Sequence, residues 1–218
     1  MGIIYKNEPV KTAIDNHQKS NHMKKYLYSI AASFFAFMFL VSCNPKQQPD
    51  NAAINEVDTM YFIQQGDSIS TIMQRVLLSN VMKATKAAGP AYAVTFCNER
   101  AMPLTDSLSE KYHCQIQRIS DKYRNPSNKP TKYDEDILLR SGSSNSGEPL
   151  LVSENGRVVY YKPIRIAMPA CLNCHGTDNK DIAPKTLEAI VQKYPNDLAV
   201  GYKEGDFRGL WKITFQEE

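Results

Sequence analysis

The sequence lacks the features that identify several common classes of protein. It has no internal repeat and no long low-complexity segment, and 42% of its 218 residues are hydrophobic while 22% are charged. This composition is typical of globular chains, and it excludes collagen-like, disordered and polytopic membrane proteins. There is also no Gly-rich phosphate loop, no supported Ser/His/Asp arrangement and no basic stretch interleaved with aromatic residues. We therefore expect no nucleic-acid partner.

The chain also has little net charge, and that charge lies at one end. Lys and Arg number 26 against 23 Asp and Glu, which gives a formal charge of +3. Residues 1–42 hold five lysines and two acidic residues, so they account for the whole excess. The basic balance therefore indicates a targeting segment rather than a surface for an anionic partner.

No apolar run is long enough for a comfortable membrane span. The longest one, residues 27–41, has 15 residues and follows Lys24 and Lys25, as the hydrophobic core of a signal peptide does. The run ends at Leu40-Val41-Ser42-Cys43, which resembles the lipobox of bacterial lipoproteins. We expect Cys43 to be lipidated and to become the mature N-terminus, and the alternative is an uncleaved N-terminal anchor.

These features predict three parts of the chain. Residues 1–42 are an extension plus a lipoprotein signal peptide, residues 43–60 a flexible tether, and residues 61–218 one domain. Acyl chains on Cys43 would hold the domain at a lipid bilayer. Asn44 after the cysteine resembles the pattern of lipoproteins sent to the outer membrane. We therefore expect an exported bacterial lipoprotein at the outer membrane, facing the periplasm.

The apolar pattern after the tether predicts helices first. Residues 69–84 keep the i, i+3, i+4, i+7 spacing of an amphipathic helix that ends at Gly89-Pro90. A second stripe of this kind covers residues 94–108, with Pro103 expected to bend or restart the helix. Long helices at the N-terminal side of the domain are therefore predicted.

Strands dominate the pattern further along the chain. A β-hairpin is expected around Asn155-Gly156, because this pair is the strongest short hairpin signal. Further strands are expected at residues 114–120 and 208–215, short helices at 133–139 and 184–194, and a turn-rich loop at 121–131. Helices followed by an antiparallel sheet predict an α+β fold.

The clearest chemical motif is Cys171-Leu172-Asn173-Cys174-His175. The pattern C-x-x-C-H is the attachment signature of c-type haem. Two thiols about one helical turn apart can bond the two vinyl groups on one edge of the porphyrin, and the adjacent imidazole then lies beneath the iron. The motif predicts one covalent haem c on Cys171 and Cys174, with His175 as an axial ligand.

Two other interpretations of the cysteine pair remain open. A structural zinc site would need two further ligands from Cys97, Cys114, His113 and His175, but the chain has no second clean ligand pair. A disulfide or thioredoxin-like redox pair would be expected at the start of a helix after a strand, and the sequence does not indicate that context.

The second axial ligand decides between electron transfer and chemistry at an open iron. Cys97 lies on the inward stripe of its predicted helix, and the small residue Ala101 one turn further leaves room for a flat macrocycle. The alternative for Cys97 is an inert buried thiol. Other candidates for the position are Cys114, His113, Met102 and Met168.

Polar residues near the predicted strand and loop are candidates for contact with the haem. Arg124 is a candidate partner for a haem propionate, and Asn125 for fixing the loop through backbone hydrogen bonds. Arg118 is a further candidate, because its neighbours alternate like those of a half-buried strand. The alternative is a plain turn-rich connector with solvated arginines.

Four segments together resemble a known family. They are AVTFCNERAMP, RISDKYRNPSNKP, PACLNCHG and GYKEGDFRGLWKITF. In this order they are similar to the motifs of a PAS-like bacterial haem-c domain family, over about Gly66 to Phe215. Members occur alone or as the extracytoplasmic input of sensor proteins. The resemblance implies a PAS-like antiparallel sheet with flanking helices, covalent haem on Cys171 and Cys174, and His175 opposite a thiolate at Cys97.

The expected function follows from this ligand set. A thiolate favours ferric iron and lowers the reduction potential relative to Met/His ligation. We expect a membrane-anchored monohaem protein for redox or gas sensing or low-potential electron transfer, with a separate protein as its redox or signalling partner. The alternatives are a peroxidase-like haem enzyme and a non-catalytic assembly lipoprotein with structural haem.

Overall fold

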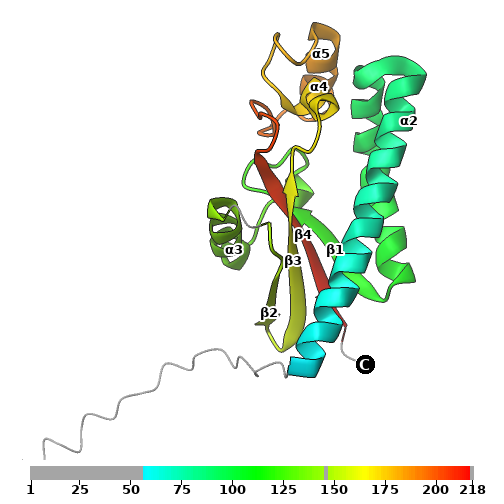
Figure 1. The fold of residues 1–218 in the computed structure, drawn as a ribbon. Helices are drawn as coiled ribbons and strands as arrows, with labels where there is room; N and C mark the ends of the chain where they lie inside the picture. The colour runs from blue at the N-terminus through cyan, green and yellow to red at the C-terminus, as the bar shows by residue number, and fades with distance from the viewer. Residues whose placement is uncertain (1–55, 145–146, 217–218) are drawn as a thin grey trace, which may run out of the picture. The chain divides into compact units, whose positions relative to one another are not determined.

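An antiparallel sheet lies between helices on both of its faces (Figure 1). The computed structural model describes residues 56–144 and 147–216. The predicted signal peptide, Cys43 and residues 43–55 of the predicted tether lie outside the described residues. In chain order the elements are α2 (Glu56–Lys111), β1 (Cys114–Ile119), η1 (Pro126–Asn128), α3 (Lys132–Ser143), β2 (Leu150–Glu154), β3 (Arg157–Arg165), η2 (Pro169–Cys171), α4 (Leu172–His175), α5 (Pro184–Lys193) and β4 (Phe207–Phe215).

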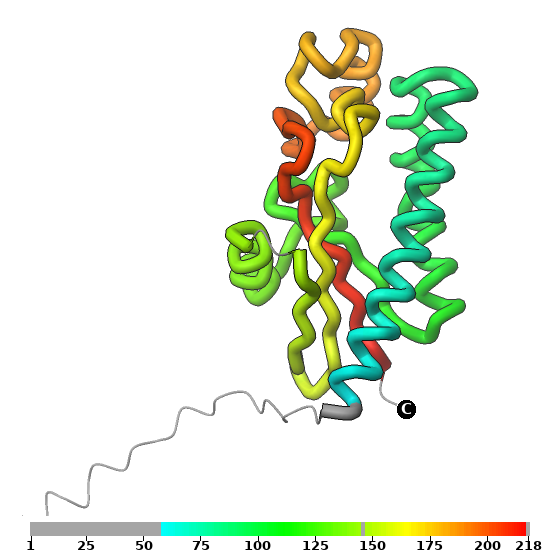
Figure 2. Tube along the Cα trace, viewed as in Figure 1, coloured from blue at the N-terminus to red at the C-terminus, as the bar shows by residue number. Residues whose placement is uncertain are grey.

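Helix α2 consists of two arms joined at a sharp kink. The backbone is non-helical only at Ala88 and at Gly89, whose φ of 82° is a conformation that favours glycine. Pro90 opens the second arm, where its missing N–H costs no helical hydrogen bond. The arms run side by side (Figure 2), which confirms the predicted break at Gly89-Pro90. Pro103 was expected to bend or restart the helix, and a restart does not occur because the dihedral angles stay helical there.

The start of α2 also corrects one predicted boundary. The helix begins at Glu56, so residues 56–60 of the segment predicted as a tether are helical. No helix among the described residues is long and apolar enough to span a membrane.

The four strands form one sheet in the order β1-β4-β3-β2, antiparallel throughout. Strands β2 and β3 form the hairpin predicted at Asn155-Gly156, and both turn residues have positive φ, 53° and 80°. The strands predicted at residues 114–120 and 208–215 and the helix predicted at 184–194 are present as β1, β4 and α5. The α+β class is therefore confirmed.

Alternation along the strands sends apolar side chains to both faces of the sheet. On one face, Ile69 and Met73 of α2 pack with residues that include Trp211 and Ile213 of β4. On the other, Leu138 of α3 belongs to a second apolar cluster, which also contains Ile119, Ile137, Val159, Tyr161 and Leu210. Residues of one strand pack on opposite faces of the sheet, because successive side chains point to alternate sides.

The segment that carries the Cys-x-x-Cys-His motif lies at one end of the sheet. There, α4 and α5 lie beside the kinked end of α2 (Figure 1). Val94 of α2 packs with Ile182, Ile190 and Tyr194 in a third apolar cluster. The motif is thus fixed between the end of the sheet and the second arm of α2.

The sheet face that packs on α3 holds a buried polar network. Asp134 is 2% exposed and accepts hydrogen bonds from the Tyr161 hydroxyl and the Lys212 ammonium, each at 2.9 Å. It also accepts one from the Thr131 hydroxyl at 2.7 Å, and Lys212 pairs with Glu154 at 3.0 Å as well. Burial raises the pKa of Asp134, but the hydrogen bonds from Lys212 and Thr131 outweigh it and hold the pKa below its ordinary value.

We expect Asp134→Ala to lower the free energy of unfolding by about 3 kcal/mol, because the buried ammonium of Lys212 then loses one of its carboxylate partners. The loss is measured by urea unfolding at neutral pH. Asp136→Ala removes an exposed carboxylate from the same helix and should change stability little.

The pH dependence of the free energy of unfolding provides a second test of Asp134→Ala. The pKa of Asp134 is lower in the folded than in the unfolded chain. Its contribution is therefore complete above the unfolded pKa and is lost as pH falls through the folded pKa. The wild type should lose more stability than Asp134→Ala between about pH 5 and pH 2. Parallel curves for the two proteins would contradict this role of Asp134.

Candidate functional site

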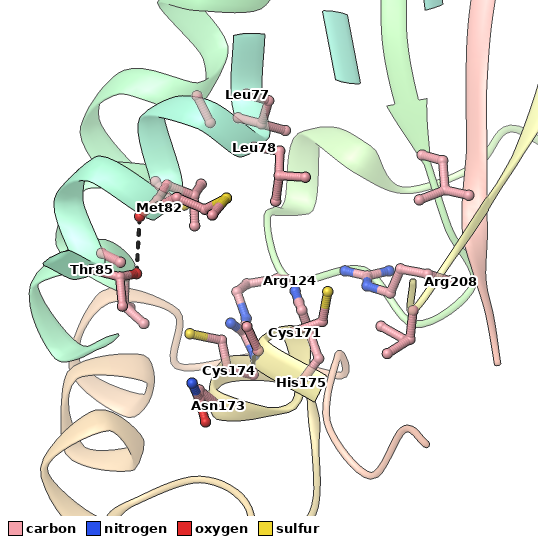
Figure 3. Close-up of a pocket in the computed structure, with 18 of the residues that line it drawn as sticks. Leu77, Leu78, Met82, Thr85, Arg124, Cys171, Asn173, Cys174, His175 and Arg208 are labelled. Atoms are coloured by element: carbon pink, nitrogen blue, oxygen red, sulfur yellow. Dashed lines mark hydrogen bonds between the residues drawn. The ribbon is translucent and has the colours of Figure 1, made fainter. Parts of the chain in front are cut away.

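A cavity of about 400 Å³ opens between α2, the sheet and the segment that leads into α4. This volume lies in the usual range for small-molecule and cofactor sites. Apolar side chains of α2, among them Leu77, Leu78 and Met82, face the cavity from one side. Cys171, Cys174 and His175 face it from another (Figure 3). The motif residues and an apolar wall thus enclose one space.

His175 is half-buried and held in one orientation by the backbone. Its Nδ1 lies 2.8 Å from the carbonyl oxygen of Ala199. Because a carbonyl can only accept, Nδ1 carries the proton and Nε2 keeps its lone pair. Burial lowers the pKa of His175 well below its ordinary value, and the charges of Arg124 and Arg208 lower it further. The imidazole is therefore neutral, which is the form that binds a metal.

Cys171 and Cys174 lie about one helical turn apart, at the start and within α4. Both are free thiols and both line the cavity. Burial raises the pKa of Cys174 to about 11. The sequence argument that the pair lacks a helix start after a strand is wrong, because Cys171 directly precedes α4.

The candidates for a second axial ligand separate into two groups. Cys97, on the second arm of α2, lines the cavity together with Met102 and Met168. His113 and Cys114 line a different hollow, at the opposite end of β1. The structure therefore brings Cys97 and the two methionines to the motif and separates the other two candidates from it.

The surroundings of Cys97 act on its thiol in opposite directions. Burial raises its pKa, while the charges of Arg118 and Arg124 lower it. Burial is the stronger effect, so the pKa of Cys97 lies above its ordinary value, and the two cations offset part of this rise.

The structure does not assemble the alternative zinc site. Within residues 56–144 and 147–216, no group of three His, Cys, Asp or Glu side chains is arranged to hold a metal ion. Cys114 and His113, two of the ligands considered for it, lie at the far end of the sheet.

Arg124 makes contacts within the protein that the sequence did not indicate. Its Nε and Nη2 donate to the two carboxylate oxygens of Asp197 at 3.1 and 2.9 Å. Nη2 also lies 2.6 Å from the Cys174 carbonyl and 3.3 Å from that of Ala199. Only 9% of Arg124 is exposed. The guanidinium therefore fixes the motif segment to the chain around residues 197–199, and the interpretation as a solvated arginine is wrong.

The structure places Asn125 and Arg118 at the cavity as well. The Asn125 side chain accepts a hydrogen bond from the Ser127 N–H at 3.0 Å and caps η1, which confirms that it fixes the loop. Arg118 lines the cavity, and its Nε is buried without a hydrogen-bond partner.

Two residues of the site were not identified from the sequence. Arg208 lines the cavity and donates from Nη1 to the Ser120 hydroxyl at 2.8 Å and to the Lys122 carbonyl at 3.1 Å. Burial lowers the pKa of Arg208 to about 10. Asp197 is the second missed residue. Arg208 lies within the last of the four family segments, but its partners are 88 and 86 positions away. Asp197 lies in none of the four segments, so only the fold could reveal it.

Gly176 is required for a close approach of the chain to itself. A Cβ at this position would lie 2.5 Å from Cβ of Asp181 and 2.8 Å from the Leu172 carbonyl oxygen. The turn after α4 therefore leaves no space for a side chain.

We expect Arg124→Gln to destabilise the protein by about 3 kcal/mol, because the buried Asp197 carboxylate then loses its cationic partner. Thermal and urea unfolding measure the loss, and limited proteolysis should show earlier cleavage between residues 169 and 206. Lys132→Gln breaks the exposed pair with Glu135 and should change neither measurement noticeably. Equal effects of the two substitutions would contradict the role of Arg124.

Comparison with known proteins agrees with this architecture. The family model described as Tll0287-like matches residues 46–216. No curated protein matches the chain significantly. A solved structure, the crystal structure of the cyanobacterial heme-protein Tll0287, is 23% identical. It matches with a TM-score of 0.55 over 75% of this chain and 98% of that chain, and this likeness shows a shared fold. The family resemblance read from the four motifs is confirmed, and the chain belongs to the Tll0287-like family.

Proposed function

We propose that this protein is a membrane-anchored monohaem c-type protein for redox or gas sensing or low-potential electron transfer. Cys171 and Cys174 would bond the haem covalently, and His175 and Cys97 would be its axial ligands. One observation carries the proposal: all four side chains line the same cavity. The similar solved protein, Tll0287, is described as a heme-protein.

The residues at the cavity fit a haem. The apolar wall from α2 suits the faces of a porphyrin, and the two thiols lie about one turn apart. The His175 imidazole is neutral and has a free Nε2. A bound haem would supply the one-electron chemistry of its iron and a position for a small gas.

The protein's own groups would tune this chemistry. The Ala199 carbonyl orients His175 and makes its Nε2 more basic. The charges of Arg118 and Arg124 offset part of the rise that burial causes in the pKa of Cys97. A thiolate ligand stabilises the ferric state and lowers the reduction potential relative to a methionine ligand. These features support a low-potential centre rather than a high-potential electron shuttle.

The proposed location rests on the sequence. A signal peptide at residues 1–42 and lipidation at Cys43 would place the domain on a lipid bilayer, at the outer membrane and facing the periplasm. Export agrees with the proposed cofactor, because c-type haem is attached after transport. The partner would be a separate redox or signalling protein.

The cofactor proposal is tested by expressing the full chain in a bacterium that matures c-type cytochromes. We expect a positive pyridine haemochrome test for one covalent haem, which Cys171→Ser combined with Cys174→Ser abolishes. Cys97→Ala should keep the covalent haem, lose the thiolate-type ferric spectrum and raise the midpoint potential.

Cys114→Ala is the matched control for the axial ligand. It removes a buried thiol that does not line the cavity, and it should leave the spectrum unchanged. Absence of covalent haem from the wild type would overturn the proposed function. A spectrum that Cys97→Ala does not alter would exclude this thiol as a ligand.

The anchoring proposal predicts that Cys43→Ala moves the protein from the membrane fraction to the soluble fraction. The substitution removes the only residue proposed to carry acyl chains, and labelled palmitate should enter the wild type alone. Membrane retention of an unlabelled wild type would favour an uncleaved anchor instead.

A further inference from the structure

Arg118 differs from the other arginines that line the cavity. These are Arg124, Arg165 and Arg208, and each donates to acceptors of the protein itself. Arg118 lies on β1 and pairs in register with Trp211. Its Nε is buried and has no hydrogen-bond partner. Of the described acidic side chains, none forms an ion pair with it.

The buried Nε of Arg118 is energetically unfavourable when no acceptor binds to it. Arg118 as a whole is half-buried, but its Nε is buried and has no acceptor in place of water, and the guanidinium stays charged. Burial lowers the pKa of Arg118, and the anionic form of the Cys97 thiol would raise it. Asp197, a buried carboxylate near the motif, is already bound by Arg124 through both of its oxygens. An anionic partner for Arg118 can therefore be supplied by a ligand bound in the cavity.

We propose that Arg118 binds a carboxylate of the ligand that fills the cavity. The inference rests on the proposed function, under which this carboxylate is a haem propionate. The planar fork of a guanidinium suits a carboxylate, and such pairs are strong when water is excluded. The sequence made both Arg118 and Arg124 candidates for this contact, and the Nε and Nη2 of Arg124 already donate to the protein.

A second anion has to be distinguished from the carboxylate. Arg118 is close enough to Cys97 for its charge to lower the pKa of that thiol. Replacing Arg118 could therefore change the spectrum through an interaction with the Cys97 thiolate alone. In that case, its replacement should have no effect once Cys97 is absent. A carboxylate contact would persist without Cys97.

The test compares holoprotein with Arg118→Gln, alone and combined with Cys97→Ala. Resonance Raman spectra report the propionate bending mode, which responds to hydrogen bonding of the propionate. We expect this mode to shift in Arg118→Gln and to shift equally in the Cys97→Ala background. The midpoint potential should fall in Arg118→Gln, because a positive charge beside the iron is removed.

Arg100→Gln is the matched control, because it removes an equal charge from an exposed position on α2. It should leave the propionate mode and the potential unchanged. Arg118→Lys keeps the charge but not the fork, so the mode should shift while the potential stays near that of the wild type.

The outcomes separate the inference from the function on which it rests. An unshifted mode in an Arg118→Gln protein that carries haem overturns the inference and leaves the haem proposal standing. A shift that disappears in the Cys97→Ala background also overturns it, in favour of the thiolate. If Arg118→Gln yields no folded protein, a crystal structure of the wild-type holoprotein decides, by whether a propionate oxygen lies within hydrogen-bond distance of Arg118. Absence of haem from the wild type would instead reject the proposed function.

Discussion

The bidentate pair between Arg124 and Asp197 holds together the segments that form the end of the cavity. Arg124 comes from the loop after β1, and its guanidinium also binds the carbonyl of Cys174. Asp197 in turn accepts from the backbone N–H of Ala199 at 2.9 Å, and the Ala199 carbonyl orients His175. One ion pair therefore fixes a cysteine of the motif and the imidazole beside it. Such ion pairs and hydrogen bonds matter because a cofactor site needs its metal-binding side chains held in position before the cofactor binds.

Backbone hydrogen bonds reinforce the same region without any side chain. The Tyr202 N–H donates to the His175 carbonyl at 2.9 Å, and the Gly201 N–H to that of Gly176 at 2.7 Å. The short helix α4 has too few residues to be stable alone. Its position depends on these bonds and on Arg124, which explains how a four-residue helix can carry the most chemically informative residues of the chain.

Local signals made much of the fold and the motif predictable from the sequence. The hairpin at Asn155-Gly156 and the break at Gly89 each follow from residues that are adjacent in the chain. The Cys-x-x-Cys-His motif is local too, and it lies in the cavity together with Cys97, which was chosen from a helical stripe. Asp197 could not be found in this way, because 73 positions separate it from Arg124. The neighbours of Arg124 form an ordinary turn-rich loop, so they gave no indication of its ion pair with Asp197.

The charges that line the cavity are not balanced as those of the whole domain are. Outside residues 1–42, acidic and basic residues balance at 21 each, yet four arginines line the cavity. Local positive charge favours the reduced state of a bound iron, because reduction adds an electron, whereas thiolate ligation favours the ferric state. Under the proposed function these effects oppose each other within one site. A propionate bound to Arg118 would neutralise one of the cations, so the ligand's own carboxylate would help the thiolate to keep the potential low.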